Sequence, residues 1–400
     1  MSRAFSESLY IVYRRIKAIS IAALYYLFRF LPMDDKKVVL SSFEGKQGYS
    51  CNPKYIAEEI LKRNKLSSQP YKLIWLVNDT SNIFPSEILV KKNSFWNRAY
   101  QLSTAAIWID NHRKPLETRK RKKQLYIATW HGAIGFKAVG ELRGTSFPEI
   151  ARLVSKHDSQ LVDYFLSNSS WCSDMYRKAF FYEGEIIKTG SPRCDVYREA
   201  EHMRKRIRKE FELPENSKIL LYAPTFRSGT QNMVMNTLSG ESRLSYEALH
   251  EVLNKKFQGD WYIFVRLHPS LKGQKFENKE NNSIIFDITN RDDAYDVLAA
   301  TDLFISDYSS IAFDAAAMNI PVFIFAEDMD DYVKDRGRLL WDMEDLPFKV
   351  SYRNDELLKN IIEFNEEEYH NGLGKLRDEV ELLEDGYASQ RVVDLIQKKT

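Results

Sequence analysis

After Pro32, short apolar runs alternate with amphipathic stretches along the chain. The runs have the length of buried β-strands, and the stretches between them have the spacing of helices that cover a sheet. One such helix is predicted at 52–63, where Asn52 is a candidate N-cap and Pro53 takes the first helical position. This alternation predicts a mostly parallel α/β sheet. Its predicted strands are 36–43, 71–77, 106–110, 124–130 and 164–169.

The same alternation begins again after about residue 200. A length of 400 residues also favours two α/β domains over one. The turn "GSPRCD" at 190–195 marks the boundary, so we assign 32–195 to an N-terminal domain and 196–400 to a C-terminal domain. The last helix is a candidate to pack back on the N-terminal domain. The predicted strands of the second half are 218–224, 261–269, 283–289, 302–310 and 321–326.

The segment before Pro32 is apolar and basic. Its longest uncharged run, residues 18–28, is shorter than the roughly 20 residues that span a bilayer, and no signal-peptide cleavage site follows it. We predict that residues 1–31 form a helix in the membrane interface, with its basic side chains toward the lipid head groups. The alternative is an ordinary amphipathic helix packed on the N-terminal domain.

Composition narrows the possible functions. A net charge of +2 gives no overall positive field of the kind that attracts nucleic acid, and no nucleic-acid-binding module is recognisable. Cys51, Cys172 and Cys194 are far apart and form no CxxC pair, so a reducing cytoplasm fits best. No motif demands a metal or a P-loop, and we predict neither a cofactor nor an obligatory metal.

Polar residues gather at the ends of the predicted strands. Ligands bind at the carboxyl ends of the strands in open parallel sheets, and two facing α/β domains imply a cleft between them. We therefore predict one site in an interdomain cleft. Its candidate residues are His131, Arg193, Thr225, Arg227, Arg266, His268, Asp307, Ser309 and Ser310.

Two of these motifs have anion-binding chemistry. Ser309 and Ser310 precede the helical pattern "IAFDAAAM", and a helix N-terminus suits a phosphate, although plain capping is the commoner role of such serines. Arg266 and His268 share a face of an extended backbone and can bind a diphosphate. The alternative for His268 is a histidine satisfied within its own domain.

His131 lies in the stretch "ATWHGAIGFK", where a predicted strand meets a loop. A neutral imidazole can accept a proton from an attacking hydroxyl near physiological pH. Gly132 and Gly135 would let the backbone approach a ligand closely. We predict that His131 is a catalytic base that faces the phosphate-binding residues across the cleft. A purely structural histidine is the alternative.

At these residues the chain resembles the CDP-glycerol glycerophosphotransferase family, whose members assemble teichoic acids and capsules. The resemblance runs from about residue 125 to 395. It implies the GT-B fold, in which two Rossmann-like domains enclose the active site. The matching pieces, in family order, are "TWHGAIGFK", "GSPRCDV", "YAPTFR", "RLHP", "SDYSSIAFDAAAMNIPVFIFAEDMDDY" and "EDGYASQRVVD".

The resemblance also implies roles for single residues. His131 is the implied base, and His268 with Arg266 would stabilise the charge on the departing CMP. The sequence "HGAIGFK" departs from the Thr-Pro pair that more usually follows His-Gly in the family, which puts acceptor or donor selectivity in doubt. The implied substrate-binding residues are Gly132, Ala133, Ile134, Gly135, Arg193, Pro224, Thr225, Arg266, Ser309, Ser310 and Asp314.

The implied reaction is phosphoryl transfer. An acceptor hydroxyl attacks the glycerol-side phosphorus of CDP-glycerol, CMP leaves and a phosphodiester forms. The expected partners are CDP-glycerol, a lipid-linked glycan acceptor and the anionic cytoplasmic face of the cell membrane, to which the protein binds peripherally. The basic run at 113–123 could meet anionic lipid or a lipid-diphosphate acceptor, and a solvated surface loop is the alternative.

Three other functions stay open from the sequence. The donor could be CDP-ribitol or another CDP-polyol, because the residues do not separate these polyols. A GT-B glycosyltransferase or epimerase acting on a nucleotide sugar is a second possibility. A catalytically inactive scaffold in a polysaccharide-synthesising complex is the third, against which the retained His131 and His268 argue.

Overall fold

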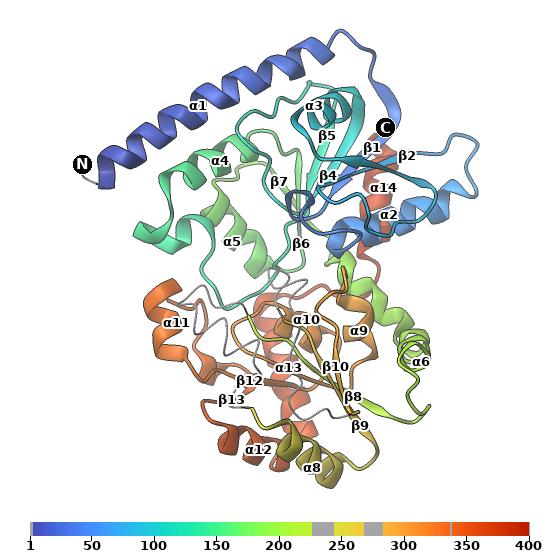
Figure 1. The fold of residues 1–400 in the computed structure, drawn as a ribbon, viewed down its shortest axis with the longest axis vertical. Helices are drawn as coiled ribbons and strands as arrows, with labels where there is room; N and C mark the ends of the chain where they lie inside the picture. The colour runs from blue at the N-terminus through green and yellow to red at the C-terminus, as the bar shows by residue number, and fades with distance from the viewer. Residues whose placement is uncertain (1–2, 226–243, 268–282, 337, 400) are drawn as a thin grey trace. The chain divides into compact units, whose positions relative to one another are not determined.

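The computed structural model describes residues 3–225, 244–267, 283–336 and 338–399. The chain divides into two compact units (Figure 1). The N-terminal unit comprises Met1–Ala133, Val139–Asp195 and Leu383–Thr400. The C-terminal unit comprises Ile134–Ala138 and Val196–Leu382.

A seven-stranded parallel sheet forms the core of the N-terminal unit, in the order β3-β2-β1-β4-β5-β6-β7. The central strands are buried along nearly their whole length, as expected where helices cover both faces of a parallel sheet. The strand order reverses between β1 and β4, as in Rossmann folds. The strands are β1 (Asp34–Ser41), β2 (Lys72–Val77), β3 (Ile88–Lys92), β4 (Ala105–Asp110), β5 (Leu125–Ala128), β6 (Tyr164–Ser167) and β7 (Glu185–Lys188).

Helices from both ends of the chain belong to this unit. The last helix packs against α2, and its Val392, Val393 and Ile396 join the core beneath the sheet. The helices are α1 (Arg3–Phe28), α2 (Cys51–Asn64), α3 (Phe95–Thr104), α4 (Glu149–Ser159), α5 (Ser170–Phe180) and α14 (Ala388–Lys399). Short 3-10 helices are η1 (Phe43–Gly45), η2 (Gly140–Ser146) and η3 (Pro192–Glu199), the last of which runs across the boundary at Asp195.

The long helix α1 packs against α3 through one narrow face (Figure 1). Ala18, Ala22 and Tyr25 are buried on that face. No helix among the described residues is both long enough and apolar enough to cross a membrane. The exposed large apolar side chains of α1 include Leu9, Val12, Tyr13, Ile16 and Ile19.

The C-terminal unit has a six-stranded parallel sheet in the order β10-β9-β8-β11-β12-β13, again the Rossmann order, with its reversal between β8 and β11. The strands are β8 (Lys218–Tyr222), β9 (Trp261–Val265), β10 (Ile285–Asp287), β11 (Leu303–Ser306), β12 (Val322–Phe325) and β13 (Lys349–Ser351). The described helices are α6 (Ala200–Glu210), α8 (Tyr246–Phe257), α9 (Tyr295–Ala300), α10 (Ile311–Ala317), α11 (Met329–Arg336), η5 (Met343–Asp345), α12 (Asn354–Ile362) and α13 (Glu366–Val380).

The prediction of two parallel α/β sheets is confirmed, with differences in detail. Residues 134–138 were predicted to belong with 32–195, but they pack in the C-terminal unit, where Phe136 contacts Phe313. The backbone carbonyl of Phe136 there accepts a hydrogen bond of 2.7 Å from the Leu340 N–H. The last helix, α14, lies in the N-terminal unit, on which the sequence made it a candidate to pack. Strands β3, β7 and β13 were not predicted.

Candidate active site

His131 follows strand β5 in the N-terminal unit, three residues beyond the last strand residue. The strand predicted to reach Trp130 ends earlier, at Ala128, and Trp130 has a left-handed φ of 52°. Such a conformation is costly for a bulky residue and persists only where the surroundings enforce it. The chain therefore turns sharply before His131.

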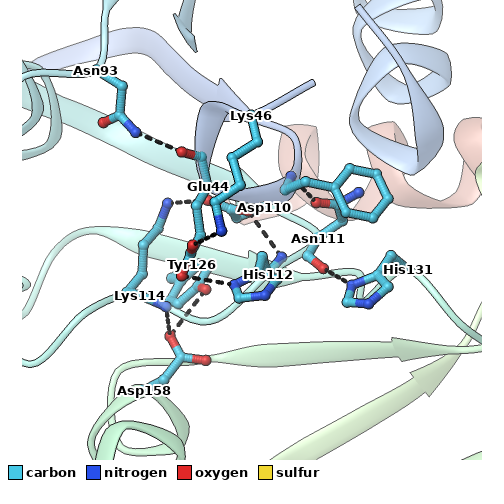
Figure 2. Close-up of polar contacts among 11 residues, drawn as sticks. Glu44, Lys46, Asn93, Asp110, Asn111, His112, Lys114, Tyr126, His131 and Asp158 are labelled. Carbon is cyan, nitrogen blue, oxygen red and sulfur yellow. Dashed lines mark hydrogen bonds and ion pairs between the residues drawn. The ribbon is translucent and has the colours of Figure 1, made fainter. Parts of the chain in front are cut away.

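One hydrogen bond fixes the protonation of the His131 ring (Figure 2). Its Nδ1 lies 2.8 Å from the backbone carbonyl oxygen of Asn111, the residue directly after β4. A carbonyl oxygen only accepts, so Nδ1 carries the proton and Nε2 carries the lone pair. No other described residue hydrogen-bonds this ring, which leaves Nε2 available to a substrate hydroxyl.

The surroundings of His131 also keep the imidazole uncharged. Its ring lies 4.2 Å from that of Trp130 and 5.0 Å from that of Phe43, and it stacks on His112 at 5.7 Å with an angle of 8°. Burial, followed by the positive charge of His112, lowers the pKa of His131 to about 3. Neutral imidazole is the form that can act as a base.

Charged side chains contact His112 and hold its ring in place (Figure 2). Glu44, in η1, lies 3.2 Å from Nδ1 of His112 and also pairs with Lys46 at 3.0 Å. The hydrogen bond from His112 is the main cause that lowers the pKa of Glu44 to about 2. The backbone N–H of His112 donates to Asp110 Oδ1 at 2.9 Å, so both ends of the residue are held in place.

Asn52 connects the His131 turn to Arg193. Its Nδ2 donates to the carbonyls of Thr129 at 3.3 Å and Trp130 at 3.0 Å, and its Oδ1 accepts from the Arg193 N–H at 3.1 Å. We predicted Asn52 as an N-cap, but the N-cap of α2 is Ser50, and the Asn52 side chain is used for these longer-range bonds. No pattern in the sequence indicated this positioning role.

The predicted substrate residue Arg193 therefore lies beside the His131 turn. Its side chain is only 1% exposed, and its Nη1 lies 3.8 Å from Sγ of Cys51. The charge of Arg193 contributes to the lowered pKa of His131. Gly132 adjoins the same turn, and its carbonyl accepts a hydrogen bond of 3.1 Å from the Tyr176 hydroxyl. Ala133 is the last residue of this segment in the N-terminal unit.

Ile134 and Gly135 belong to the C-terminal unit. The side chain of Ile134 is buried, and a Cβ placed on Gly135 would lie only 3.0 Å from Cβ of Ser310. That distance is tighter than ordinary van der Waals contact, so glycine lets this backbone segment lie against the start of α10.

Pro224 and Thr225 follow strand β8, and an acidic residue holds Thr225 in place. Asp307, after β11, accepts hydrogen bonds from the Thr225 N–H at 3.0 and 2.9 Å and from the Thr225 hydroxyl at 3.0 Å. Thr225 and Asp307 are both buried. Asp307 therefore shapes the loop after β8.

The side chain of Ser310, directly before α10, does not cap this helix in the way that the sequence suggested. Ser310 takes the N-cap position, but its side chain makes no capping hydrogen bond, because its backbone is already helical with φ −61° and ψ −18°. Ser309 and Ser310 are half-buried. Neither hydroxyl is shown to perform the capping role that the sequence suggested as the alternative to phosphate binding.

The remaining candidates of the C-terminal unit lie among acidic neighbours. Arg266 directly follows β9, and its Nη2 lies 3.5 Å from the carbonyl of Arg291; burial lowers its pKa. Asp314 is buried in α10 and accepts a hydrogen bond of 2.7 Å from the Tyr295 hydroxyl. The predicted residues Arg227 and His268 lie outside the described part of the chain.

The sequence singled out His131 as a candidate base, but it did not single out Asn111 or His112 beside that ring. The residues "NHR" directly after β4 were a usable signal, since β4 and β5 are adjacent parallel strands whose ends meet at one edge. Within the described residues no group of three or more His, Cys, Asp or Glu side chains could hold a metal ion.

Comparison with known proteins identifies the family. Residues 23–398 match the family model of CDP-glycerol:poly(glycerophosphate) glycerophosphotransferases. The chain belongs to this family. It is 32% identical over 381 residues to a teichoic acid poly(glycerol phosphate) polymerase of Staphylococcus epidermidis, covering 91% of this chain and 50% of that protein. It thus spans about half the length of that relative.

Other relatives are matched along most of their length. A teichoic acid poly(glycerol phosphate) polymerase of Bacillus spizizenii is 24% identical over 394 residues, which cover 96% of this chain and 97% of the relative. Ribitol-phosphate polymerases are also similar to the chain. Among solved structures, a variant of the wall teichoic acid polymerase TagF soaked with CDPG aligns with a TM-score of 0.78 at 28% identity, covering 98% of this chain and 97% of that one.

Proposed function

We propose that this chain transfers glycerol phosphate from CDP-glycerol to a hydroxyl of a membrane-linked glycan or polyol-phosphate acceptor, with release of CMP, in teichoic acid or capsular polysaccharide synthesis. The observation that carries the proposal is the His131 ring, which is neutral and has its lone pair on Nε2 at the carboxyl end of β5. Family membership supports the choice of donor.

The proposed chemistry uses that lone pair. The acceptor oxygen forms a bond to the glycerol-side phosphorus, the bond from this phosphorus to the CMP oxygen breaks, and the hydroxyl proton moves to Nε2 of His131. The hydrogen bond from Nδ1 to the Asn111 carbonyl holds the ring and stabilises the imidazolium that forms. Positioning and charge stabilisation supply most of the rate in such transfers.

The proposal includes the GT-B arrangement, with a cleft between the two units. Two sheets in the Rossmann order support it. In this arrangement the CDP-glycerol donor binds the C-terminal unit, and His268 and Arg266 stabilise the charge on the leaving CMP. The proposed donor-contacting residues are Gly132, Ala133, Ile134, Gly135, Arg193, Pro224, Thr225, Arg266, Ser309, Ser310 and Asp314.

We also propose that α1 holds the protein at the cytoplasmic face of the membrane. Its exposed apolar side chains, such as Ile16 and Ile19, stand beside the basic Arg14, Arg15 and Lys17, a combination that suits an anionic lipid surface. Removal of residues 1–31 is then expected to move the protein from the membrane pellet to the supernatant. Unchanged pelleting would contradict this part of the proposal.

The donor is tested by incubating the full chain with a lipid-linked disaccharide acceptor and either CDP-glycerol, CDP-ribitol or a UDP-sugar. Release of CMP with CDP-glycerol, together with an acceptor heavier by one glycerol phosphate, is the expected result. The similarity to ribitol-phosphate polymerases makes CDP-ribitol the second candidate donor. Turnover of the UDP-sugar with neither CDP-polyol would overturn the proposal.

A further inference from the structure

Two arginines of the N-terminal unit are not used by the mechanism above. Arg113 follows β4 and Arg143 lies in η2, both in the N-terminal unit. Both side chains are half-buried. Neither guanidinium makes a hydrogen bond or an ion pair with any residue that the structure describes. Half-buried arginines are usually paired, so this arrangement needs an explanation.

Aromatic rings hold Arg113 in place of an acid. Its guanidinium carbon lies 4.8 Å from the ring centre of Phe180, 5.3 Å from that of Trp130 and 5.7 Å from that of Phe147. The Trp130 ring in turn lies 4.2 Å from that of His131. This stacking fixes the plane of the guanidinium next to the catalytic ring while its N–H groups keep their hydrogen-bonding capacity.

The nearby acids are committed to other partners. Asp158 accepts hydrogen bonds from the Lys114 N–H at 2.8 Å and the Tyr126 hydroxyl at 3.1 Å (Figure 2). Glu44 pairs with His112 and Lys46. Asp158 and Glu44 favour the charged form of Arg113 from a distance, but neither acid forms an ion pair with it.

Phe147, whose ring Arg113 contacts, directly follows η2, the 3-10 helix that contains Arg143. Burial lowers the pKa of Arg113 to about 10, and the positive charge of Arg143 contributes to that shift. Arg113 stays charged at neutral pH. Two unpaired guanidinium groups repel each other, and an anion bound by both offsets that repulsion. Phosphate oxygens match the planar donors of arginine best.

We propose that Arg113 and Arg143 form an anion-binding subsite that holds a phosphate of the acceptor substrate, so that its neighbouring hydroxyl lies at Nε2 of His131. The assignment of the phosphate to the acceptor rests on the proposed function, in which the donor diphosphate binds the C-terminal unit. The subsite selects acceptors that end in a polyol phosphate over neutral glycans.

The binding test uses sn-glycerol 3-phosphate as the probe and glycerol as the neutral control. The NMR signal of the His131 imidazole in the full-length protein, assigned with His131→Gln, is followed during each titration. We expect the signal to shift with glycerol 3-phosphate but not with glycerol, and we expect the shift to be lost in Arg113→Gln and Arg143→Gln. No shift in the wild type, or the same shift in both variants, would overturn the proposal.

Arg152 provides a matched control. It packs 5.9 Å from the same Phe147 ring, but it is paired with Glu141 and Glu149. Arg152→Gln should leave glycerol 3-phosphate binding unchanged, and equal losses in Arg152→Gln and Arg113→Gln would show a general effect of charge and reject the subsite. If Arg113→Gln does not fold, Arg113→Lys, which keeps the charge but loses the stacked fork, should bind with intermediate affinity.

Kinetics separate this subsite from the proposed function. With an acceptor that ends in glycerol phosphate, Arg113→Gln should raise the acceptor KM about ten-fold or more and leave the CDP-glycerol KM within about two-fold. An unchanged acceptor KM in an active enzyme would reject the subsite. Absence of transfer by the wild type, with binding of glycerol 3-phosphate still lost in Arg113→Gln, would reject the proposed function alone.

Discussion

The two units share a strand order but use the carboxyl ends of their strands differently. In the N-terminal unit the loops after β4 and β5 bring together aromatic rings, cationic groups and His131, whose Nε2 has no partner among the described residues. In the C-terminal unit the loop after β11 and the following helix α10 contain acids that already accept hydrogen bonds, Asp307 from Thr225 and Asp314 from Tyr295. The same topology therefore presents a reactive group in one unit and a shaped backbone in the other.

The largest loss of stability is expected when Asp307 of the C-terminal unit is replaced. Asp307→Ala leaves the buried N–H groups of Thr225 and Tyr308 without their acceptor and should lower the free energy of unfolding by roughly 3 kcal/mol. Urea denaturation measures this change. The control Asp331→Ala removes an exposed acid that pairs, among the described residues, with Lys334 alone, and it should change stability by less than about 0.5 kcal/mol. Equal effects would contradict a shaping role for Asp307.

Replacement of Asn52 tests how the N-terminal unit holds the turn that contains His131. Asn52→Ala removes three hydrogen bonds around the His131 turn and should cost roughly 2 kcal/mol, together with a clear loss of kcat. Asn64→Ala, at the other end of α2, removes two similar bonds to Tyr71. It should lower stability but leave the kcat of the folded enzyme unchanged. A normal kcat in folded Asn52→Ala would contradict the positioning role.

The sequence predicted the sheets more fully than the site. Strong apolar runs such as 71–77 specify buried parallel strands. Strand β7 has a charged residue at each end and is little buried, so its sequence carries no such signal. His131 was recognisable because it follows a strong strand. Asn111 acts through its backbone carbonyl and Asn52 through contacts to residues far along the chain, so neither left a pattern in its own neighbourhood.

The pH dependence of stability should distinguish the buried groups of the N-terminal unit. Burial lowers the pKa of His131 to about 3, so the unfolded chain binds more protons, and this contribution to stability is present above about pH 6.5 and is lost as the pH falls. Burial raises the pKa of Asp158 to about 7, so its contribution is present at low pH and is lost as the pH rises toward 7.

The free energy of unfolding, measured from about pH 4 to about pH 8, reports both contributions. His131→Gln should reduce the loss of stability on the acid side, and Asp158→Asn should reduce the loss as the pH rises. An unchanged acid-side slope in His131→Gln would contradict the neutral, buried state of this ring.

The smallest effect is expected at Gly135. Gly135→Ala places a methyl group 3.0 Å from Cβ of Ser310, which requires a shift of a few tenths of an ångström at the start of α10 and should cost about 1 kcal/mol or less. Gly374→Ala, in helix α13 with open space around it, should instead stabilise the protein by about 0.5–1 kcal/mol. Thermal denaturation compares the two, and stabilisation by Gly135→Ala would contradict the close approach.

The most direct test of the account is the rate of CMP release from CDP-glycerol by the wild type, His131→Gln and His157→Gln. His157 is a matched control because it is a half-buried histidine of the same unit that also bonds a backbone carbonyl, at 3.0 Å from Thr118. The account predicts a loss of roughly 10²–10⁴-fold in kcat for His131→Gln and a normal rate for His157→Gln. A rate for folded His131→Gln within about ten-fold of the wild type would contradict the assignment of His131 as the base.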